Sequence, residues 1–319
     1  MGLKAKKPEV KEKRLKLFLF GPPGSRKTTS ALQFPKSVLI DMERGSEQYT
    51  KTISKAGSVV LETNNPDDVM AEVKVLLTEK HEYRTLIIDP VTIYYQALQD
   101  KWSRIFEHHA KTEKEKELQD FGMRYWGRVK SEYKSFLRLL LKLDMNLILT
   151  SHQKDIYGPN MQKVGIGPDS MKGDDYVFDY VFRLNVVGDK AVAITEKQRS
   201  EPLEPQKFPP EFEWSYKNFL KFYGTEIIER EAVAVPMATA AQVAEITSLL
   251  EVVKVKEEDV TKLFTKHDVD DWDGLTAEAI QKYIDNLRKK IAPVNAPLIS
   301  AEEMAADGHA EKSKKAVTA

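Results

Sequence analysis

The sequence predicts an α/β fold, with a mostly parallel sheet covered by helices on both faces and a small all-helical module after it. Short apolar runs of strand length alternate with longer helical stretches between residues 15 and 197. This alternation is typical of parallel strands joined by crossover helices. After Gly224 the strand-like runs stop, and the remaining chain has only helical periodicity.

Five buried strands are expected in the first part of the chain, because each is a short apolar run with turn or charged residues at its ends. These runs are 15–20, 37–41, 58–62, 84–90 and 145–150. A sixth and a seventh run, 180–187 and 190–197, flank Gly188-Asp189 and predict an antiparallel hairpin at one edge of the sheet.

Helices are expected between these strands. One follows the first strand from Thr28 to Phe34, where Pro35 stops it. Residues 65–80 begin with Asn65 as a cap, a proline in the first turn and two aspartates that favour the positive end of a helix. A charged helical stretch leads to about residue 120, and residues 123–143 form a long amphipathic helix.

The rest of the chain divides into four parts. We expect a flexible basic arm at 1–14, a linker at 224–236, a helical module at 237–291 and a disordered tail at 292–319. Thr239 and Gln242 fit a capping box at the start of the module. The core then spans residues 15–223.

The composition excludes several classes of protein. The chain has 319 residues with 49 basic and 49 acidic side chains, so it has no overall attraction for nucleic acid. It has no cysteine, which rules out disulfides, thiolate catalysis and cysteine-based zinc sites. The first residues lack an apolar stretch of signal-peptide length, and no run of about 18 apolar residues occurs. We therefore expect a cytoplasmic protein without a membrane span.

The segment GPPGSRKTT resembles a phosphate-binding loop. The pattern GxxxxGK[ST] matches residues 21–28 except at Arg26, and the loop lies between a predicted strand and a predicted helix. Backbone N–H groups of such a loop surround a phosphate, Lys27 reaches the β- and γ-phosphates, and the Thr28 hydroxyl binds Mg²⁺. The residues expected to bind nucleotide are Gly21, Pro22, Pro23, Gly24, Ser25, Arg26, Lys27, Thr28 and Thr29.

Arg26 stands where the pattern has glycine. If its φ is positive, a side chain with a Cβ costs about 1–2 kcal/mol, which a bound nucleotide or the guanidinium beside phosphate can offset. The alternative is a decayed loop that binds nucleotide weakly or not at all. On the sequence alone, Arg26→Gly is expected to keep the fold and to leave or raise nucleotide affinity, whereas loss of binding would make the arginine a working ligand.

Two strand ends supply carboxylates. Asp89 ends the run TLIID, where a nucleotidase holds the water shell of Mg²⁺, although capping a loop is the simpler role. Asp41 ends the run at 37–41 and Glu43 follows it, and alternation along a strand predicts that both side chains project to the same side. Glu43 is the candidate base that orients the attacking water, with Asp41 as a possible supporter. A solvent-facing acidic turn is the alternative.

Two further polar segments follow strands. The run at 145–150 leads into Thr150, Ser151, His152 and Gln153, which are candidates to sense the γ-phosphate. Lys197 and Arg199 follow the last strand, and such cations can stabilise the transferring phosphoryl group in a neighbouring subunit. A surface charge pair explains them equally well.

These motifs, in this order along the chain, resemble those of the AAA-type RecA-like P-loop ATPase core. IDME (40–43) is similar to its strand with the catalytic glutamate, IIDP (87–90) to its magnesium-site strand and TSHQK (150–154) to its sensor segment. Residues 123–155, FDYVFRL (178–184) and TEKQR (195–199) resemble a family of bacteriophage nucleotide-binding proteins that includes single-strand annealing proteins of phage recombination.

This resemblance covers about residues 15–223 and is specific for the family rather than for annealing. It implies ATP and Mg²⁺ as ligands, a homo-oligomer, single-stranded DNA as partner and the host cytoplasm as location. Candidate DNA contacts are the basic arm, the module and the loop 154–173, in which Tyr157 can stack on a base. A loop without a ligand is as compatible with the sequence.

The expected function is that of an ATP-binding, ATP-hydrolysing protein acting on single-stranded DNA in recombination. Whether Arg26 permits hydrolysis stays open. The alternatives are a non-catalytic nucleotide-binding module that recruits recombination or single-strand-binding proteins through residues 237–291, and a helicase loader.

Overall fold

The computed structural model describes residues 13–112, 121–199, 207–253, 255–267 and 269–291. Its contacts divide the chain into two units, which meet between Val235 and Pro236. Most of the arm expected at 1–14 and the whole tail expected at 292–319 lie outside the described residues.

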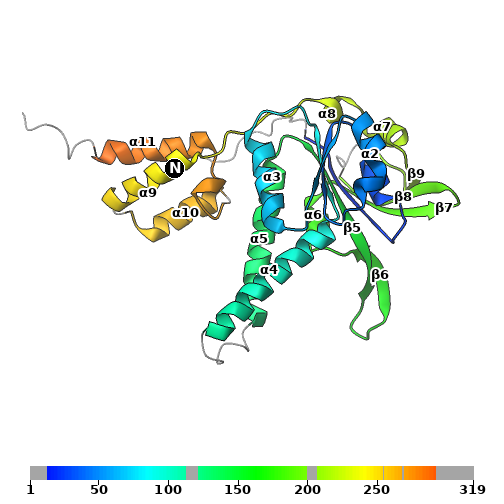
Figure 1. The fold of residues 1–319 in the computed structure, drawn as a ribbon, viewed down its shortest axis with the longest axis horizontal. Helices are drawn as coiled ribbons and strands as arrows, with labels where there is room; N and C mark the ends of the chain where they lie inside the picture. Colours follow the sequence, from blue (N-terminus) through cyan, green and yellow to red (C-terminus); the bar gives the residue numbers. More distant parts are fainter. Residues whose placement is uncertain (1–12, 113–120, 200–206, 254, 268, 292–319) are drawn as a thin grey trace, which may run out of the picture. The chain divides into compact units, whose positions relative to one another are not determined.

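The first unit contains one sheet, in which nine strands of the described chain take part (Figure 1). Their order is β3-β2-β4-β5-β1-β7-β8-β9, and β6 pairs only with β5. The strands are β1 (Lys16–Gly21), β2 (Ser37–Asp41), β3 (Val59–Glu62), β4 (Thr85–Asp89), β5 (Asn146–Tyr157), β6 (Lys163–Pro168), β7 (Tyr180–Val187), β8 (Lys190–Gln198) and β9 (Glu211–Glu213).

The first five strands and β7 are parallel, which confirms the α/β fold class. The β7–β8 hairpin is antiparallel as expected. It does not form the edge of the sheet, because the short strand β9 pairs with β8. Contiguous apolar runs made the buried strands predictable, since a strand with both faces covered has few polar positions. The expectation that residues 58–62 are buried is wrong: β3 ends the strand order, and Val59 and Val60 are 40% and 36% exposed.

Helices cover both faces of the sheet (Figure 1). The helices of the first unit are α1 (Lys27–Ala31), α2 (Thr50–Lys55), α3 (Pro66–Thr78), α4 (Val91–Thr112), α5 (Phe121–Lys142), α6 (Asp174–Val177), α7 (Tyr216–Tyr223) and α8 (Glu226–Glu229). Asn65 caps α3 as predicted, accepting a hydrogen bond from the Asp67 N–H at 3.1 Å. Helix α1 is shorter than the expected span to Phe34.

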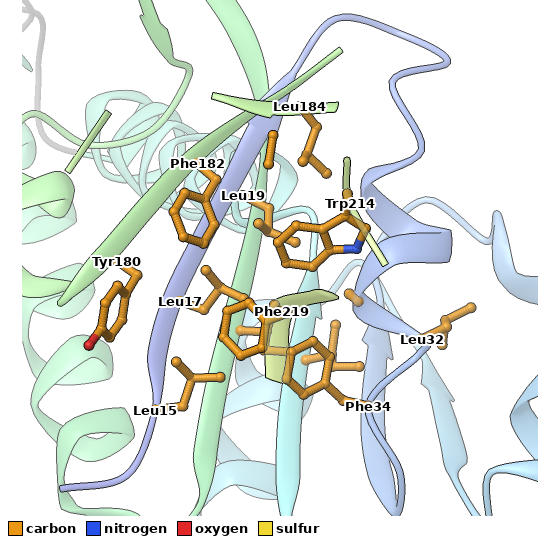
Figure 2. Close-up of a cluster of buried hydrophobic side chains, with 14 of the residues drawn as sticks. Leu15, Leu17, Leu19, Leu32, Phe34, Tyr180, Phe182, Leu184, Trp214 and Phe219 are labelled. Atoms are coloured by element: carbon orange, nitrogen blue, oxygen red, sulfur yellow. The ribbon is translucent and has the colours of Figure 1, made fainter. Parts of the chain in front are cut away.

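One hydrophobic cluster fixes β1 at the centre of the sheet. Leu17 and Leu19 of β1 pack with Phe182 of β7, Phe34 and Phe219, all of which are fully buried (Figure 2). Truncating such a side chain costs about 3–5 kcal/mol. The cluster therefore holds the strand that leads directly into the loop at 21–29.

Two predictions at the ends of the core need correction. Arg14, assigned to the flexible arm, is 6% exposed and pairs with Asp144 at 2.9 Å. Its guanidinium also donates to the carbonyl oxygens of Ile227, Arg230 and Glu231. The expected linker therefore starts as a docked segment of the first unit, because a buried guanidinium needs acceptors on every side.

The loop expected at 154–173 is largely a β-hairpin. Strand β5 continues past the sheet to Tyr157 and pairs antiparallel with β6, from Gln153 opposite Pro168 to Tyr157 opposite Lys163. The Gly158 N–H donates to the Gln162 carbonyl at 2.9 Å and closes the turn. Pairing with β6 satisfies the backbone of these polar residues, which periodicity alone assigned to a loop.

The second unit is helical. It consists of α9 (Ala240–Val253), α10 (Glu257–His267), the 3₁₀ turn η3 (Trp272–Gly274) and α11 (Ala277–Ile291). The predicted capping box is present, since Gln242 N–H donates to Thr239 Oγ1 and Thr239 N–H donates to Gln242 Oε1. Ile246, Ile280 and Ile284 are fully buried in its core.

Candidate functional site

The carboxyl ends of four neighbouring parallel strands meet at one edge of the sheet. The register pairs Asp41 of β2 with Asp89 of β4, and Gly21 of β1 with His152 of β5. Strand β5 separates β4 from β1. Polar residues that lie far apart in the sequence are thus brought to the same level, where ligands of open α/β sheets bind.

A cavity of about 670 Å³ lies at this edge. Its lining comes from the loop after β1, the turn after β2, the end of β4 and the root of the β5–β6 hairpin. The lining residues are Gly21, Pro23, Gly24, Arg26, Lys27, Thr28, Thr29, Glu43, Tyr49, Asp89, Pro90, His152, Gln153 and Asp169.

The loop at 21–29 is held in a defined shape. A Cβ at Gly21 would lie 2.3 Å from the Leu184 carbonyl oxygen, so only glycine fits there. Ser25 is buried, and its N–H donates to the Pro22 carbonyl at 3.2 Å. The Lys27 ammonium donates to the carbonyl oxygens of Gly21 at 3.0 Å and Pro22 at 3.1 Å. The loop therefore curls around the lysine that should reach phosphate.

Burial lowers the pKa of Lys27, while the charges of Asp89 and Glu43 oppose this shift. Desolvation of an ammonium strengthens its attraction to an anion placed beside it. A polyphosphate in this cavity can supply the acceptors that the Gly21 and Pro22 carbonyls supply in the structure.

Arg26 adopts the left-handed conformation, with φ 66° and ψ 29°, directly before α1. The condition considered for this residue in the sequence, a positive φ, is therefore met. This conformation costs a non-glycine residue about 1–2 kcal/mol. The loop thus keeps the backbone shape that favours glycine although it carries an arginine.

Asp89 is 7% exposed, and the hydroxyls of Thr150 and Thr28 hydrogen-bond its carboxylate. Burial raises the pKa of Asp89, these two hydrogen bonds lower it, and the charges of Asp41 and Glu43 raise it further. A buried carboxyl group with this environment favours a cation nearby.

Thr28 and Asp89, predicted separately as magnesium-site residues, therefore lie in contact. Their oxygen atoms are of the type that Mg²⁺ prefers, and Mg²⁺ is commonly held by one carboxylate together with phosphate oxygens and water. The residues present fit that ion. No cluster of three or more acidic or imidazole side chains able to hold a metal by itself occurs among the described residues.

Asp41 anchors the turn that carries Glu43. It is 3% exposed, and its carboxylate accepts hydrogen bonds from the N–H groups of Glu43 at 3.1 Å, Gly45 at 3.2 Å and Ser46 at 2.7 Å. Glu43 itself is exposed and lines the cavity. The two carboxylates thus differ in position, one supporting the backbone and the other facing the cavity.

The four residues proposed as sensors fall into two groups. Thr150 and Ser151 are buried within the fold. The Thr150 hydroxyl forms a hydrogen bond with Asp89, and the Ser151 hydroxyl forms one with Thr92. His152 and Gln153 line the cavity. His152 Nε2 lies 2.8 Å from Glu43 Oε1, so the candidate base and a candidate sensor are in contact.

Lys197 and Arg199 lie at the opposite end of the sheet from this cavity. Gln198 pairs with Tyr180 at the start of β7, which is parallel to β1. The Lys197 ammonium donates to the Asp175 carbonyl at 2.6 Å, and Arg199 pairs with Asp179 at 3.0 Å. Neither residue lines the cavity of its own chain.

Tyr49 and Asp169 line the cavity but were not identified from the sequence. Asp169 follows β6, and its N–H donates to the His152 carbonyl at 2.7 Å. The β5–β6 pairing brings it there. No local signal marks it, whereas Tyr49 could have been noticed as an aromatic residue shortly after the acidic turn.

A glycine-constrained loop, a buried lysine and a threonine–aspartate pair at the ends of parallel strands define a P-loop nucleotide-binding domain. The model of an AAA domain family matches residues 13–202, and the chain belongs to this family. It is an AAA-type P-loop domain with a mostly parallel sheet and a helical unit after it.

Among solved structures, the chain is similar to a crystal structure of the RadB recombinase. The identity is 13% and the TM-score 0.37, over 59% of this chain and 83% of that one. No curated protein matches the chain. In the described part of the chain, no helix has the length and apolar character needed to cross a membrane.

Proposed function

We propose that this chain is a RecA-like ATPase that binds and hydrolyses ATP and acts on single-stranded DNA in phage recombination, by annealing or strand pairing. One observation carries the nucleotide part of the proposal. Lys27, the Thr28–Asp89 pair and Glu43 line one cavity at the end of β1.

In the proposed reaction, water attacks the γ-phosphate in line with the leaving ADP. Lys27 leaves the loop carbonyls and donates to the β- and γ-phosphates. Glu43, held by the turn that Asp41 anchors, orients the water and accepts its proton. Mg²⁺, held by Thr28 and through its water shell by Asp89, would offset charge on the phosphates.

His152 supports a link between nucleotide and DNA. It contacts Glu43 and belongs to β5, the strand that continues into the β5–β6 hairpin. On this hairpin Tyr157 is 56% exposed and Met161 80% exposed. Exposed aromatic side chains beside lysines suit stacking with bases and contact with phosphates.

Lys197 and Arg199 fit a role between subunits. Because they lie at the end of the sheet away from the cavity, a cation that reaches a nucleotide from there must belong to a neighbouring copy. Such an arrangement joins unlike faces of successive subunits and gives a ring or a filament.

The test is ATP turnover by purified protein with Mg²⁺, with and without single-stranded DNA. We expect turnover that DNA stimulates, and loss of both nucleotide binding and turnover in Lys27→Ala. Unchanged affinity in that variant would refute the loop assignment. Tight ATP binding without turnover would favour the alternative of a non-catalytic recruiting module, and DNA unwinding or helicase loading would favour a loader.

The DNA part has a separate test. Tyr157→Ala should weaken binding of single-stranded DNA by about 5- to 150-fold, since stacking of one base contributes about 1–3 kcal/mol. Tyr176→Ala is the matched control, because Tyr176 is 75% exposed but lies on α6 rather than the hairpin. Equal effects of both changes would contradict the assignment of the hairpin.

A further inference from the structure

We propose that Arg26 is itself a phosphate ligand, and that its guanidinium binds the terminal phosphate of the nucleotide from within the same chain. This inference rests on the proposed function and specifies which phosphate the side chain of Arg26 binds.

The backbone of Arg26 serves the loop without help from its side chain. Its carbonyl accepts hydrogen bonds from the Ser30 N–H at 2.9 Å and the Thr29 hydroxyl at 3.1 Å, which close the first turn of α1. Its side chain makes no capping hydrogen bond. A glycine would serve these backbone contacts with less strain, so the arginine needs another explanation.

The side chain of Arg26 is exposed and lines the cavity together with Lys27, Glu43 and His152. Within the described residues, no hydrogen bond or ion pair engages its guanidinium. Among the described residues that line the cavity, it carries the only guanidinium. A permanently charged group thus stands at the cavity with its donors available.

The other cations proposed for catalysis are placed differently. Lys27 is held inside the loop by carbonyl oxygens, and Lys197 and Arg199 are bound at the far end of the sheet. Among the described residues that line the cavity, Arg26 is therefore the one whose permanent positive charge can add to that of Lys27.

The chemistry of a guanidinium suits a terminal phosphate. Its planar fork donates two parallel hydrogen bonds to two phosphate oxygens, and it stays charged at all relevant pH values. The terminal phosphate carries the most negative charge and, in the proposed reaction, lies near Glu43 and His152. Arg26 should therefore discriminate ATP from ADP, which lacks that group.

Three substitutions separate the charge of Arg26 from its backbone effect. Arg26→Gly removes the charge and relieves the strain, Arg26→Gln removes the charge and keeps the strain, and Arg26→Lys keeps the charge without the fork. The dissociation constants of Mg·ATP, ADP and AMP are measured by calorimetry for each folded variant, with thermal melting to confirm the fold.

In contrast to the expectation from the sequence alone, we expect Arg26→Gly to weaken ATP binding by about 10- to 100-fold, and Arg26→Gln likewise, the usual effect of losing a charged hydrogen bond. ADP binding should change by less than about threefold, which is far below the effect expected on ATP. Arg26→Lys should lie between the wild type and Arg26→Gln, because an ammonium keeps the charge but loses the bidentate geometry.

Arg44→Gly is the matched control. Arg44 also has a positive φ, 58°, and is exposed, but it does not line the cavity. Its replacement by glycine makes the same change in charge and strain and should leave the preference for ATP over ADP intact.

The inference is overturned if Arg26→Gly binds ATP as tightly as the wild type or more tightly, which is the outcome that strain alone predicts. An equal loss of ATP and ADP affinity also overturns it. If Lys27→Ala loses binding while the Arg26 variants do not, the proposed function survives without this inference. A wild-type protein that binds no nucleotide overturns both.

Discussion

Asp41→Asn tests how far one buried carboxylate determines the position of the candidate base. In the structure one carboxylate oxygen of Asp41 accepts from the Glu43 and Gly45 N–H groups, and the other accepts from Ser46. An asparagine can keep the first pair of bonds, but its NH₂ group then faces the Ser46 N–H. The substitution removes at least one charged hydrogen bond and places two donors against each other.

The magnitude follows from these contacts. A hydrogen bond to a charged group contributes about 1.5–3 kcal/mol, so Asp41→Asn should lower the free energy of unfolding by about 2 kcal/mol. Glu43 should also move, because its own N–H is one of the three donors. A displacement of about 1 Å can reduce a rate about 100-fold, so kcat should fall about 10- to 100-fold while ATP affinity changes little.

The assay combines urea unfolding with steady-state turnover. Tryptophan fluorescence reports on the first unit, since three of the four tryptophans belong to it. Glu62→Gln is the control, because Glu62 is the exposed register partner of Asp41 on β3 and its change should stay within about 0.5 kcal/mol. An Asp41→Asn protein with wild-type stability and kcat would refute the reasoning.

Two further predictions concern buried carboxyl groups. Burial raises the pKa of Asp89, so its charged form destabilises the fold when no metal is bound. Asp89→Asn should therefore raise the melting temperature and lower magnesium-dependent turnover at least about 100-fold. A lower melting temperature with retained turnover would contradict this. Asp174 accepts a hydrogen bond from the Tyr133 hydroxyl at 2.5 Å, and burial raises the pKa of Asp174 to about 6. The native state therefore keeps this proton to a higher pH than the unfolded chain does. The free energy of unfolding should fall as pH rises from about 4 to above 6. Asp174→Asn should remove that fall and be more stable at pH 8 by up to about 3 kcal/mol in urea unfolding; parallel pH profiles for the two proteins would show that Asp174 does not titrate in this way.

The sequence was most informative where strands are buried on both faces. Residues 37–41 were predicted with the observed ends, because the continuous apolar run ends where the strand ends. Residues 180–187 were also predicted with the observed ends, because the Gly188-Asp189 turn marks where that strand stops. Since parallel strands end at one edge, the polar residues that follow them were expected to meet. The observed contact between Asp89 and Thr150 follows from that rule.

The sequence was least informative where backbone pairing or a single ion pair determines the structure. Residues 154–168 have the glycines and prolines of a loop, yet the partner strand supplies hydrogen bonds that turn them into a hairpin. The sequence around Arg14 suggested a basic arm, but in the structure Asp144 and three carbonyl groups bind its guanidinium. These partners lie more than 100 residues away, so no local pattern contains them.

The position of Lys197 and Arg199 shows the same limit. Their spacing after a strand suggested a catalytic cation, but the direction of β8 places them at the end of the sheet away from the cavity. Strand direction is a property of the topology. It decides whether such residues serve their own chain or a neighbour.

The most direct test is a structure of the protein with Mg²⁺ and a non-hydrolysable ATP analogue. The account predicts the triphosphate inside the loop at 21–29, with Lys27 moved from the Gly21 and Pro22 carbonyls to the phosphates and the metal beside Thr28. A nucleotide bound elsewhere, or a loop that stays closed on Lys27 at saturating ligand, would contradict it.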